Sequence, residues 1–382
     1  MIVGVLLLTA GAIAAGLVTG RHHTEAVRAD NAAGDTACLS CHQQQASYES
    51  TAHRLTSRLP TRDAILASFR PGENVLRTVN PRLYYRMDST ATGFYETAVM
   101  GRAPDTSIYS QRIAYVTGLR KGQSFLYLVG DRLYQLPVSY WTGIGWANSP
   151  GYPDGRPNFD RPIRPRCLEC HATGFQSITD PNAVNRYRSD NAILGITCET
   201  CHGSGRAHVA RERSLLRWLG PRAIINPARL PRMRQLDGCA LCHNGTAPLR
   251  TAPFAHVPGQ PVEKRFDLSS APDTGAIDVH GNQVALLERS KCFRSSQMTC
   301  ATCHDVHRQQ RDVVELSGRC LTCHAVQSCG LFPQHGQGLI GRCVDCHMPL
   351  LPSNTIMASS LGRRLQPQVR THWIKVYGPG GR

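Results

Sequence analysis

Aromatic residues are scarce in this sequence of 382 residues, in which phenylalanine, tryptophan and tyrosine account for 7% and all hydrophobic residues together for 41%. A chain of this length would ordinarily contain more apolar side chains. The shortage predicts that something other than side chains fills part of the interior. Sixteen cysteines, about 4% of the chain, are also too few for a small disulfide-stabilised scaffold. Their placement makes an ordinary cytosolic enzyme improbable.

Long apolar segments are missing except at the beginning of the chain. Residues 1–20 contain no charged side chain, and a helix of that length spans about 30 Å, the thickness of a bilayer core. We predict an N-terminal transmembrane anchor there, with a secretory signal cleaved near residues 12–14 as the alternative. Residues 21–36, which include His22 and His23, form the predicted linker. No second apolar span follows.

Fourteen of the sixteen cysteines fall into seven copies of the pattern Cys-x-x-Cys-His, numbered here as motifs 1 to 7. Two thiols three residues apart can bond to the two vinyl groups of one porphyrin, and the adjacent histidine then binds the iron. The sequence therefore predicts seven covalently bound haem c groups with their irons. In chain order the motifs are Cys38, Cys41 and His42; Cys167, Cys170 and His171; Cys198, Cys201 and His202; Cys239, Cys242 and His243; Cys300, Cys303 and His304; Cys320, Cys323 and His324; and Cys343, Cys346 and His347.

Zinc is the main alternative ligand, because Cys-x-x-Cys pairs also build zinc ribbons. A zinc site would combine such pairs in twos and would not require a histidine after every second cysteine. A thioredoxin-like redox motif would occur once, near a βαβ unit. The histidine in all seven copies favours haem.

Seven further histidines are candidate second axial ligands of the irons. Two imidazoles on one iron leave no open position, as is typical of low-potential electron carriers. His256 and His335, in loops rich in proline and glycine, are the weaker candidates. Without them an iron would be five-coordinate or would use another residue, such as Met298 or Met357. The seven candidates are His53, His208, His256, His280, His307, His335 and His372.

Two cysteines, Cys292 and Cys329, lie outside the motifs. Haem c is attached on the periplasmic side of the membrane, where disulfides persist, so we predict a bridge between them. A pair of unpaired thiols is the alternative.

The spacing of the motifs is uneven, and residues 43–166 contain none. Within that gap, Phe125–Val129 and Arg132–Leu136 flank Gly130-Asp131, which predicts a β-hairpin, and Arg112–Gly118 is a candidate third strand. Residues 137–165 are expected to form a loop, and from Cys167 onward we expect short helices that carry the motifs. The predicted fold is a mostly α-helical and irregular multihaem cytochrome c with a haem-packed core. A small β-hairpin or sheet is inserted between motifs 1 and 2, so the predicted regions are 37–166 and 167–382.

Several stretches resemble the multihaem cytochrome family related to cytochrome c-554, the electron carrier of hydroxylamine oxidation. They are residues 133–140, 167–174, 195–208, 298–307 and 343–349. The resemblance implies electron transfer through closely packed haems, sometimes with one five-coordinate iron. It also implies a paired Cys292 and Cys329, and distal ligands at His53, His208, His280, His307 and His372.

These features predict a periplasmic seven-haem cytochrome, anchored to the inner membrane, that transfers electrons between a membrane or periplasmic donor and an acceptor. Its expected partners are redox proteins, with a membrane electron-transfer complex as one candidate. The alternative is a multihaem reductase or oxidase of a small nitrogen or sulfur compound at a five-coordinate haem, although no catalytic residue is predicted. The net charge of +16 is partly offset by ionised haem propionates, so we predict no nucleic-acid binding.

Overall fold

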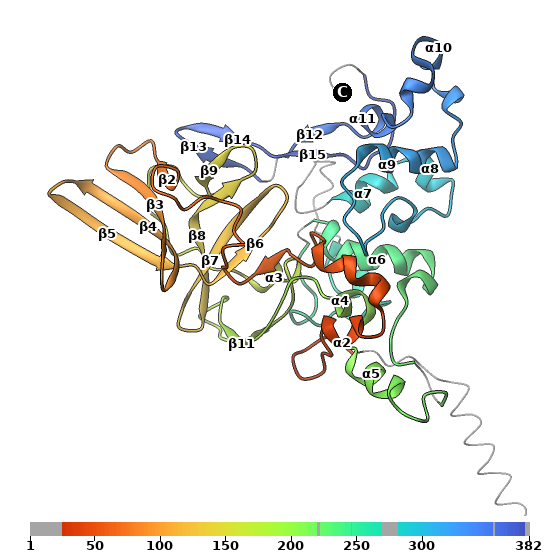
Figure 1. The fold of residues 1–382 in the computed structure, drawn as a ribbon, viewed down its shortest axis with the longest axis horizontal. Coiled ribbons are helices and arrows are strands. Elements are labelled where there is room, and N and C mark those ends of the chain that lie inside the picture. The colour runs from red at the N-terminus through yellow and green to blue at the C-terminus, as the bar shows by residue number, and fades with distance from the viewer. Residues whose placement is uncertain (1–24, 220–221, 246, 269–281, 354–355, 379–382) are drawn as a thin grey trace, which may run out of the picture.

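The computed structural model describes residues 25–219, 222–245, 247–268, 282–353 and 356–378. The predicted anchor, His22, His23 and the candidate ligand His280 lie outside these residues. Among the residues described, no helix has both the length and the apolar character needed to cross a bilayer. Long strands form one side of the molecule, and short helices that carry most of the motifs form the other (Figure 1).

Two antiparallel sheets make up the strand-rich side. Buried and partly exposed residues alternate along β3, so this strand directs one face of its sheet to a core. The five-stranded sheet contains, in spatial order, β1 (Ser57–Arg58), β6 (Tyr115–Thr117), β7 (Gly122–Val129), β8 (Arg132–Trp141) and β9 (Gly145–Asn148). The four-stranded sheet contains β2 (Val75–Arg77), β3 (Leu83–Thr90), β4 (Gly93–Arg102) and β5 (Asp105–Arg112).

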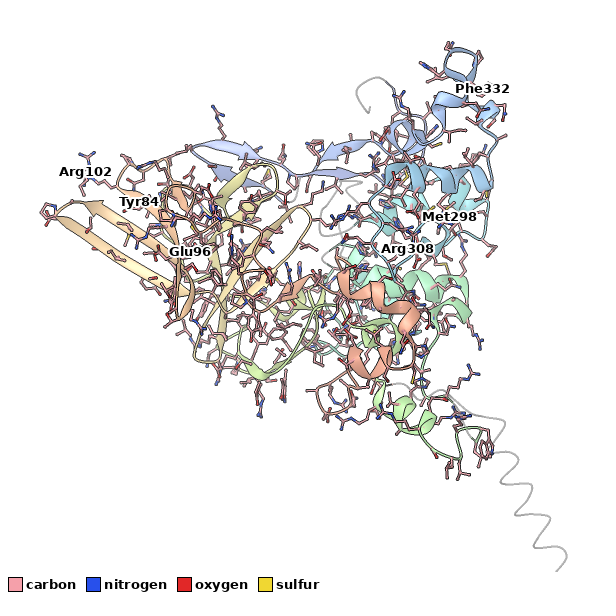
Figure 2. All side chains as sticks on the ribbon, viewed as in Figure 1. Tyr84, Glu96, Arg102, Met298, Arg308 and Phe332 are labelled. Atoms are coloured by element: carbon pink, nitrogen blue, oxygen red, sulfur yellow. The ribbon has the colours of Figure 1, made fainter. Side chains whose placement is uncertain are left out.

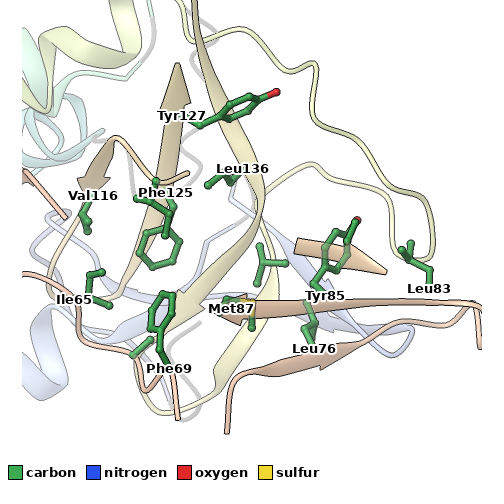
Figure 3. Close-up of a cluster of buried hydrophobic side chains, with 14 residues drawn as sticks. Ile65, Phe69, Leu76, Leu83, Tyr85, Met87, Val116, Phe125, Tyr127 and Leu136 are labelled. Atoms are coloured by element: carbon green, nitrogen blue, oxygen red, sulfur yellow. The ribbon is translucent and has the colours of Figure 1, made fainter. Parts of the chain in front are cut away.

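The inner faces of both sheets share one hydrophobic core (Figure 3). Tyr85 and Met87 of β3 enter it from one sheet, and Phe125 and Leu136 of β7 and β8 enter it from the other. Nine aromatic residues lie in this core or pack against it, which concentrates a scarce residue type in one place. They are Phe69, Tyr85, Phe94, Phe125, Tyr127, Tyr134, Tyr140, Trp146 and Phe159.

The prediction of a mostly α-helical, haem-packed fold is wrong. Helices and strands each account for 26% of the structure, and the strands lie in several antiparallel sheets. The low overall hydrophobic content concealed a side-chain core, because its apolar residues are gathered between residues 65 and 138. The largest core of the described residues is therefore filled by side chains of the β-sheets.

The predicted hairpin is present, as the pairing of β7 with β8, and Val129 lies opposite Arg132 across the two-residue turn. Tyr115–Thr117 pairs with β7 as the third strand. The expected loop from residue 137 is wrong at its start, since β8 continues through Pro137 to Trp141 and then pairs with β9. Proline fits there because the pairing of β7 and β8 shifts register at this point, so a missing N–H interrupts little of the ladder.

Three two-stranded sheets connect the sandwich with the motif-bearing side. They are β10 (Ala172–Ser177) with β11 (Tyr187–Leu194), β12 (Leu350–Pro352) with β15 (Gln368–Arg370), and β13 (Ala358–Ser360) with β14 (Arg363–Leu365). Figure 1 shows β12 and β15 extending from the helices toward the strands.

The helices described are short, and the longest of them, α6, has 12 residues. Figure 2 shows Met298 and Arg308 on this helical side of the molecule. The α-helices are α2 (Asp35–Leu39), α3 (Pro165–Glu169), α4 (Cys198–His202), α5 (Arg206–Glu212), α6 (Arg232–His243), α7 (Gln283–Glu288), α8 (Lys291–Arg294), α9 (Val313–Gly318), α10 (Phe332–His335) and α11 (Cys343–His347). The 3₁₀ turns are η1 (Gln43–Ser50), η2 (Pro227–Arg229), η3 (Val262–Lys264), η5 (Cys300–Thr302), η6 (Arg319–Thr322), η7 (Val326–Ser328) and η8 (Gly336–Leu339).

One carboxyl group, that of Glu96 on β4, is fully enclosed among the strands (Figure 2). Its Oε1 accepts a hydrogen bond of 2.8 Å from the backbone N–H of Val138, while its Oε2 is buried without a hydrogen-bond partner. Desolvation raises the pKa of Glu96 well above its ordinary value of 4.5, which favours the neutral form of this carboxyl.

Replacement Glu96→Gln is expected to stabilise the protein at neutral pH and to flatten its pH dependence. The unfolded chain releases the Glu96 proton above the ordinary pKa, so this group's contribution to stability is present below that pKa and falls as pH rises toward the raised value. Glutamine stays neutral, and its amide oxygen can accept the Val138 N–H. Urea unfolding followed by far-UV circular dichroism from about pH 4 to about pH 8 measures the effect.

The matched control is Glu263→Gln, because the Glu263 side chain is 59% exposed. Identical pH slopes for the wild type and Glu96→Gln would show that Glu96 is ionised in the folded protein.

Candidate functional site

Motifs 1, 3, 4, 5, 6 and 7 each form one tight turn of backbone. Motifs 3 and 7 coincide with α4 and α11, and motif 4 ends α6. In motifs 1, 5 and 6 the histidine N–H donates to the carbonyl oxygen of the first cysteine, at 2.9, 2.9 and 3.0 Å. This i to i−4 bond places both thiols and the imidazole of one motif on the same turn of backbone.

The motifs lie next to one another through their cysteines. The thiol of Cys201 in motif 3 lies close enough to Cys239 and Cys242 of motif 4 to help raise the pKa of both. In the same way, Cys323 of motif 6 helps raise the pKa of Cys303 of motif 5. Motifs 1, 3, 4, 5, 6 and 7 therefore form one series, with motif 2 attached at motif 4. The thiols in direct contact are Cys38 with Cys198, Cys170 with Cys242, Cys239 with Cys300, and Cys320 with Cys343.

Three motif histidines each face a histidine from outside the motifs. The ring centroids are 6.1 Å apart for His243 and His53, 6.1 Å apart for His202 and His307, and 6.2 Å apart for His304 and His372. Each pair joins residues that are distant in sequence.

Three motif or candidate histidines are oriented by a hydrogen bond from Nδ1. The Nδ1 atoms of His202, His208 and His347 lie 2.8, 3.0 and 2.9 Å from backbone carbonyl oxygens, which can only accept. Nδ1 must therefore carry the proton, which leaves Nε2 unprotonated in the neutral ring. Desolvation lowers the pKa of His202, and it lowers the pKa of His372 to about 4, so both rings are neutral at neutral pH.

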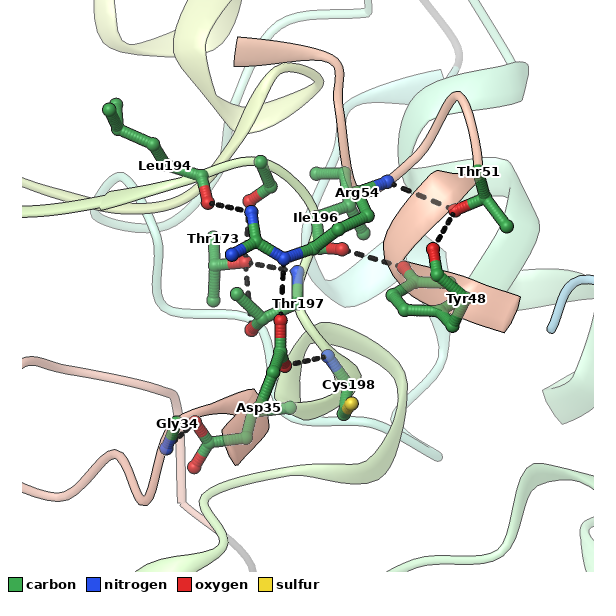
Figure 4. Close-up of polar contacts among 12 residues, drawn as sticks. Gly34, Asp35, Tyr48, Thr51, Arg54, Thr173, Leu194, Ile196, Thr197 and Cys198 are labelled. Carbon is green, nitrogen blue, oxygen red and sulfur yellow. Dashed lines mark hydrogen bonds and ion pairs between the residues drawn. The ribbon is translucent and has the colours of Figure 1, made fainter. Parts of the chain in front are cut away.

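Buried carboxylates join motif 1 to motif 3 (Figure 4). Asp35 accepts from the N–H of Cys198 at 3.0 Å and forms an ion pair of 2.7 Å with Arg54. Glu199, inside motif 3 and 1% exposed, accepts from three backbone N–H groups. The donors are Ala33 at 2.9 Å, Gly34 at 3.1 Å and Gly205 at 2.7 Å.

A second set of buried charges joins motif 2 to motif 4. Arg166 donates to the carbonyl oxygens of Leu241 and Gly245, each at 3.0 Å, and so binds the end of α6. Glu169, inside motif 2, forms an ion pair with the buried Arg265 and accepts from the N–H of Phe254 at 2.6 Å. Arg166 and Glu169 line a pocket between motifs 2, 3 and 4.

His256 lines the same pocket. Its Nε2 atom is buried and has no hydrogen-bond partner. Desolvation lowers the pKa of His256 to about 4, so its ring is neutral at neutral pH. A buried, neutral and unpartnered imidazole nitrogen is a suitable metal ligand.

Comparison with known proteins agrees with this site. The family model for cytochrome c554 and c-prime matches residues 153–203, which contain motifs 2 and 3. The C-type polyheme cytochrome OmcC of Geobacter sulfurreducens is 27% identical over 173 residues, which are 38% of this chain and 21% of OmcC. These matches support the multihaem cytochrome c family for this chain, with covalently bound haem c.

A second relative of the cytochrome is the C-type polyheme cytochrome OmcB of Geobacter sulfurreducens, which is 26% identical over 167 residues, 36% of this chain and 19% of OmcB. The chain thus spans about a fifth of the length of the curated relatives it matches. No solved structure matches it.

The separation and hydrogen bonding of the histidine rings suit the binding of haem iron. Two imidazoles bound on opposite sides of one iron, each with a metal–nitrogen distance of about 2 Å, have ring centroids about 6 Å apart. The three histidine pairs have this separation. A metal-bound histidine usually donates its other ring N–H to a backbone carbonyl or a carboxylate, as His202 and His347 do here.

The remaining candidate ligands of the cytochrome are less constrained. His208 and His42 both lie near His202, whereas His335 is exposed on α10. Met298 packs against the small core of Leu236, Leu287 and Phe293, so its side chain is part of that core. Met357 lines a shallow pocket beside Tyr152, on the strand-rich side.

The predicted disulfide is not supported, because Cys292 and Cys329 are both free in the structure. Cys292 lies near Cys303 and Cys320 of motifs 5 and 6. Cys329 follows η7 and is partly exposed. The sequence showed only that two cysteines were left over, and it contained no information on their separation.

The sequence analysis missed the buried charges that hold the motifs in place. Glu169 and Glu199 occupy the variable positions of motifs 2 and 3, where an acidic residue between two attachment cysteines was a visible signal. Asp35 and Arg54 lie near motif 1 without any distinctive pattern. Their role follows only from contacts with segments about 140 to 165 residues away, as their hydrogen bonds to Leu194 and Cys198 show.

Replacement Glu199→Gln is expected to lower the free energy of unfolding by about 2 kcal/mol, since three backbone N–H groups lose a buried charged acceptor. The amide NH₂ would also face one of these donors. Denaturant unfolding of the haem-loaded protein, followed by far-UV circular dichroism, measures the loss. The control is Glu49→Gln, an exposed position on η1. Equal stability of the two variants would contradict the assigned role of Glu199.

Proposed function

We propose that this cytochrome binds seven haem c groups and transfers electrons between a membrane or periplasmic donor and an acceptor. Residues 1–20 would anchor it to the inner membrane with its body in the periplasm. The observation that supports this most directly is the unbroken series of neighbouring motifs, from motif 1 through motifs 3, 4, 5 and 6 to motif 7. Haem c, when bound, supplies a one-electron redox couple at each motif.

The ends of this series support exchange with partner proteins. Cys41 of motif 1 and Cys346 of motif 7 are exposed, and so are Cys167 of motif 2, which branches from motif 4, and Cys201 and Cys323 within the series. Interior contacts such as that between Cys239 and Cys300 join partly buried thiols. We infer that redox partner proteins, among them a membrane electron-transfer complex, approach at these exposed motifs. Nucleic-acid binding forms no part of the proposal.

We assign axial ligands from the histidine pairs. His53 would bind opposite His243, His307 opposite His202, and His372 opposite His304, because these rings face each other at 6.1 to 6.2 Å. Each distal residue thereby ties its own segment to another motif. Such pairs leave no open position on the iron, which favours electron transfer over the reductase alternative at these three motifs.

The other four motifs have no such histidine pair among the described residues, so their ligands are assigned by proximity or by elimination. His208 is assigned opposite His42, since both lie near His202. His256 is assigned opposite His171, because its unpartnered Nε2 lies in the pocket lined by motif 2 residues. His280 and His335 remain for His324 and His347. The fourteen proposed iron ligands are thus the seven motif histidines and these seven distal residues.

Replacement His372→Ala is expected to convert one low-spin ferric haem of the purified cytochrome to high spin, because His304 would lose the ligand on the opposite side of the iron. Electron paramagnetic resonance of the oxidised protein measures the change. Intact-mass analysis should still show seven attached haems, which separates loss of a ligand from loss of attachment. His53→Ala should do the same at motif 4.

The matched control is His23→Ala, a histidine assigned to no iron, which should leave the spectrum unchanged. An unaltered low-spin spectrum in His372→Ala would contradict the assigned pair. A wild-type spectrum dominated by a high-spin haem that reduces nitrite or oxidises hydroxylamine would favour the reductase instead.

A further inference from the structure

Four large apolar side chains are exposed together in the turn that follows α5. Leu215 is 88% exposed, Trp218 71%, and Leu216 and Leu219 58% each. The helix α5 ends at Glu212, which leaves these side chains without a helical face to pack. In Figure 1, α5 lies at the lower end of the molecule, away from the sandwich. We call residues 213–219 the apolar turn.

Positive charge surrounds the apolar turn. Arg213 and Arg217 are exposed within it, and Arg206 and Arg222 are exposed on either side of it. None of these four side chains forms an ion pair with another residue in the described part of the chain. Exposed tryptophan and leucine with flanking arginines is the composition of segments that lie in the headgroup region of an anionic bilayer.

The start of the described chain runs beside the segment that leads into α5. Ser204 Oγ donates to the carbonyl oxygen of Asn31 at 2.5 Å, and Arg206 donates to that of Ala32 at 3.4 Å. Ala33 and Gly34 are bound to Glu199, as described above. Residues 31–34 are therefore fixed against the segment that leads into α5, and the uncharged stretch of residues 1–20 ends ten residues before them in sequence.

We propose that the apolar turn inserts into the surface of a bilayer that contains anionic phospholipid. Leu215, Trp218 and Leu219 enter the interface, and Arg213 and Arg217 bind phosphate groups of the lipid. This proposal rests on the membrane anchoring proposed above, and it adds a second contact that fixes how the body sits on the membrane. Motifs 1 and 3, which adjoin residues 31–34 and α5, would then be the motifs nearest the bilayer.

The positive charge and apolar side chains of the apolar turn favour lipid over protein as its binding partner. The turn carries two arginines and no acidic residue, and an anionic surface offers many equivalent phosphates at the end of an anchor. A headgroup phosphate also accepts bidentate hydrogen bonds from arginine. The same lipid surface would receive residues 1–20, so one occupant accounts for both apolar segments.

The test places the full-length, haem-loaded cytochrome in lipid nanodiscs that carry a photoactivated carbene label on the acyl chain near the headgroup. One set of discs contains phosphatidylglycerol and phosphatidylcholine, and the other contains phosphatidylcholine alone. Mass spectrometry then locates the adducts. We expect residues 213–219 to carry most adducts outside the first 24 residues, several-fold more in the anionic discs. Exposed Ile108 and Tyr109 on β5 serve as the internal reference.

Variants separate the two parts of the interaction. Arg213→Gln/Arg217→Gln should lower labelling of the turn in anionic discs to the level seen in neutral discs. The control Arg77→Gln/Arg102→Gln makes the same charge change at exposed positions on β2 and β4 and should change nothing.

Co-elution of the cytochrome with the discs reports on the anchor separately. If it co-elutes but residues 213–219 are labelled no more than Ile108 and Tyr109, the apolar turn does not bind lipid, and the anchor proposal stands. If it does not co-elute, both proposals are overturned. Equal labelling in the two kinds of disc would overturn the role of the arginines.

Discussion

The arrangement of the motifs depends on carboxylates buried inside them. Glu199 receives three backbone N–H groups from residues on both sides of motif 3, and Glu169 holds Arg265 and the N–H of Phe254 beside motif 2. A buried charge is stable only when such partners are supplied, so each carboxylate dictates which segment lies against its motif. These bonds join a residue inside the motif to segments that are distant in sequence. They therefore hold neighbouring motifs close to one another.

The β-sandwich provides the rigid support for this arrangement. Thr56 and Ser57, at β1 of the five-stranded sheet, contact motif 2, since Thr56 Oγ1 lies 2.9 Å from His171 Nδ1 and Ser57 Oγ donates to the His171 carbonyl at 2.6 Å. The side-chain core behind β1 therefore orients a motif ring directly. At the other end, Arg370 of β15 donates to the carbonyl oxygens of Val344 and Met348 and so holds motif 7.

The family was readable from the sequence because its haem-attachment motif is local: two thiols and an imidazole within five residues. The hairpin at Gly130 was readable for the same reason, since turn and strands are adjacent. The β-sandwich was not predicted because the hydrophobic content was averaged over the whole chain, which hid the apolar residues of its core. The four-stranded sheet that contains Glu96 also has no short sequence motif. Partners such as His53 for His243 depend on tertiary contacts that no local pattern encodes.

The branch at motif 4 gives the proposed series three ends, and the surroundings of each end differ. Motif 1 follows residues 31–35, which are bonded to motif 3 and to the segment that leads into α5, whereas motif 7 is held by β15 on another part of the molecule. Motif 2 is embedded between Arg166, Arg265 and β1, with Cys167 exposed. A carrier with two partners needs two surface ends that are far apart in its series, and motifs 1 and 7 meet that condition. Under the proposed anchoring, the same order would place motif 1 toward the bilayer and motif 7 away from it.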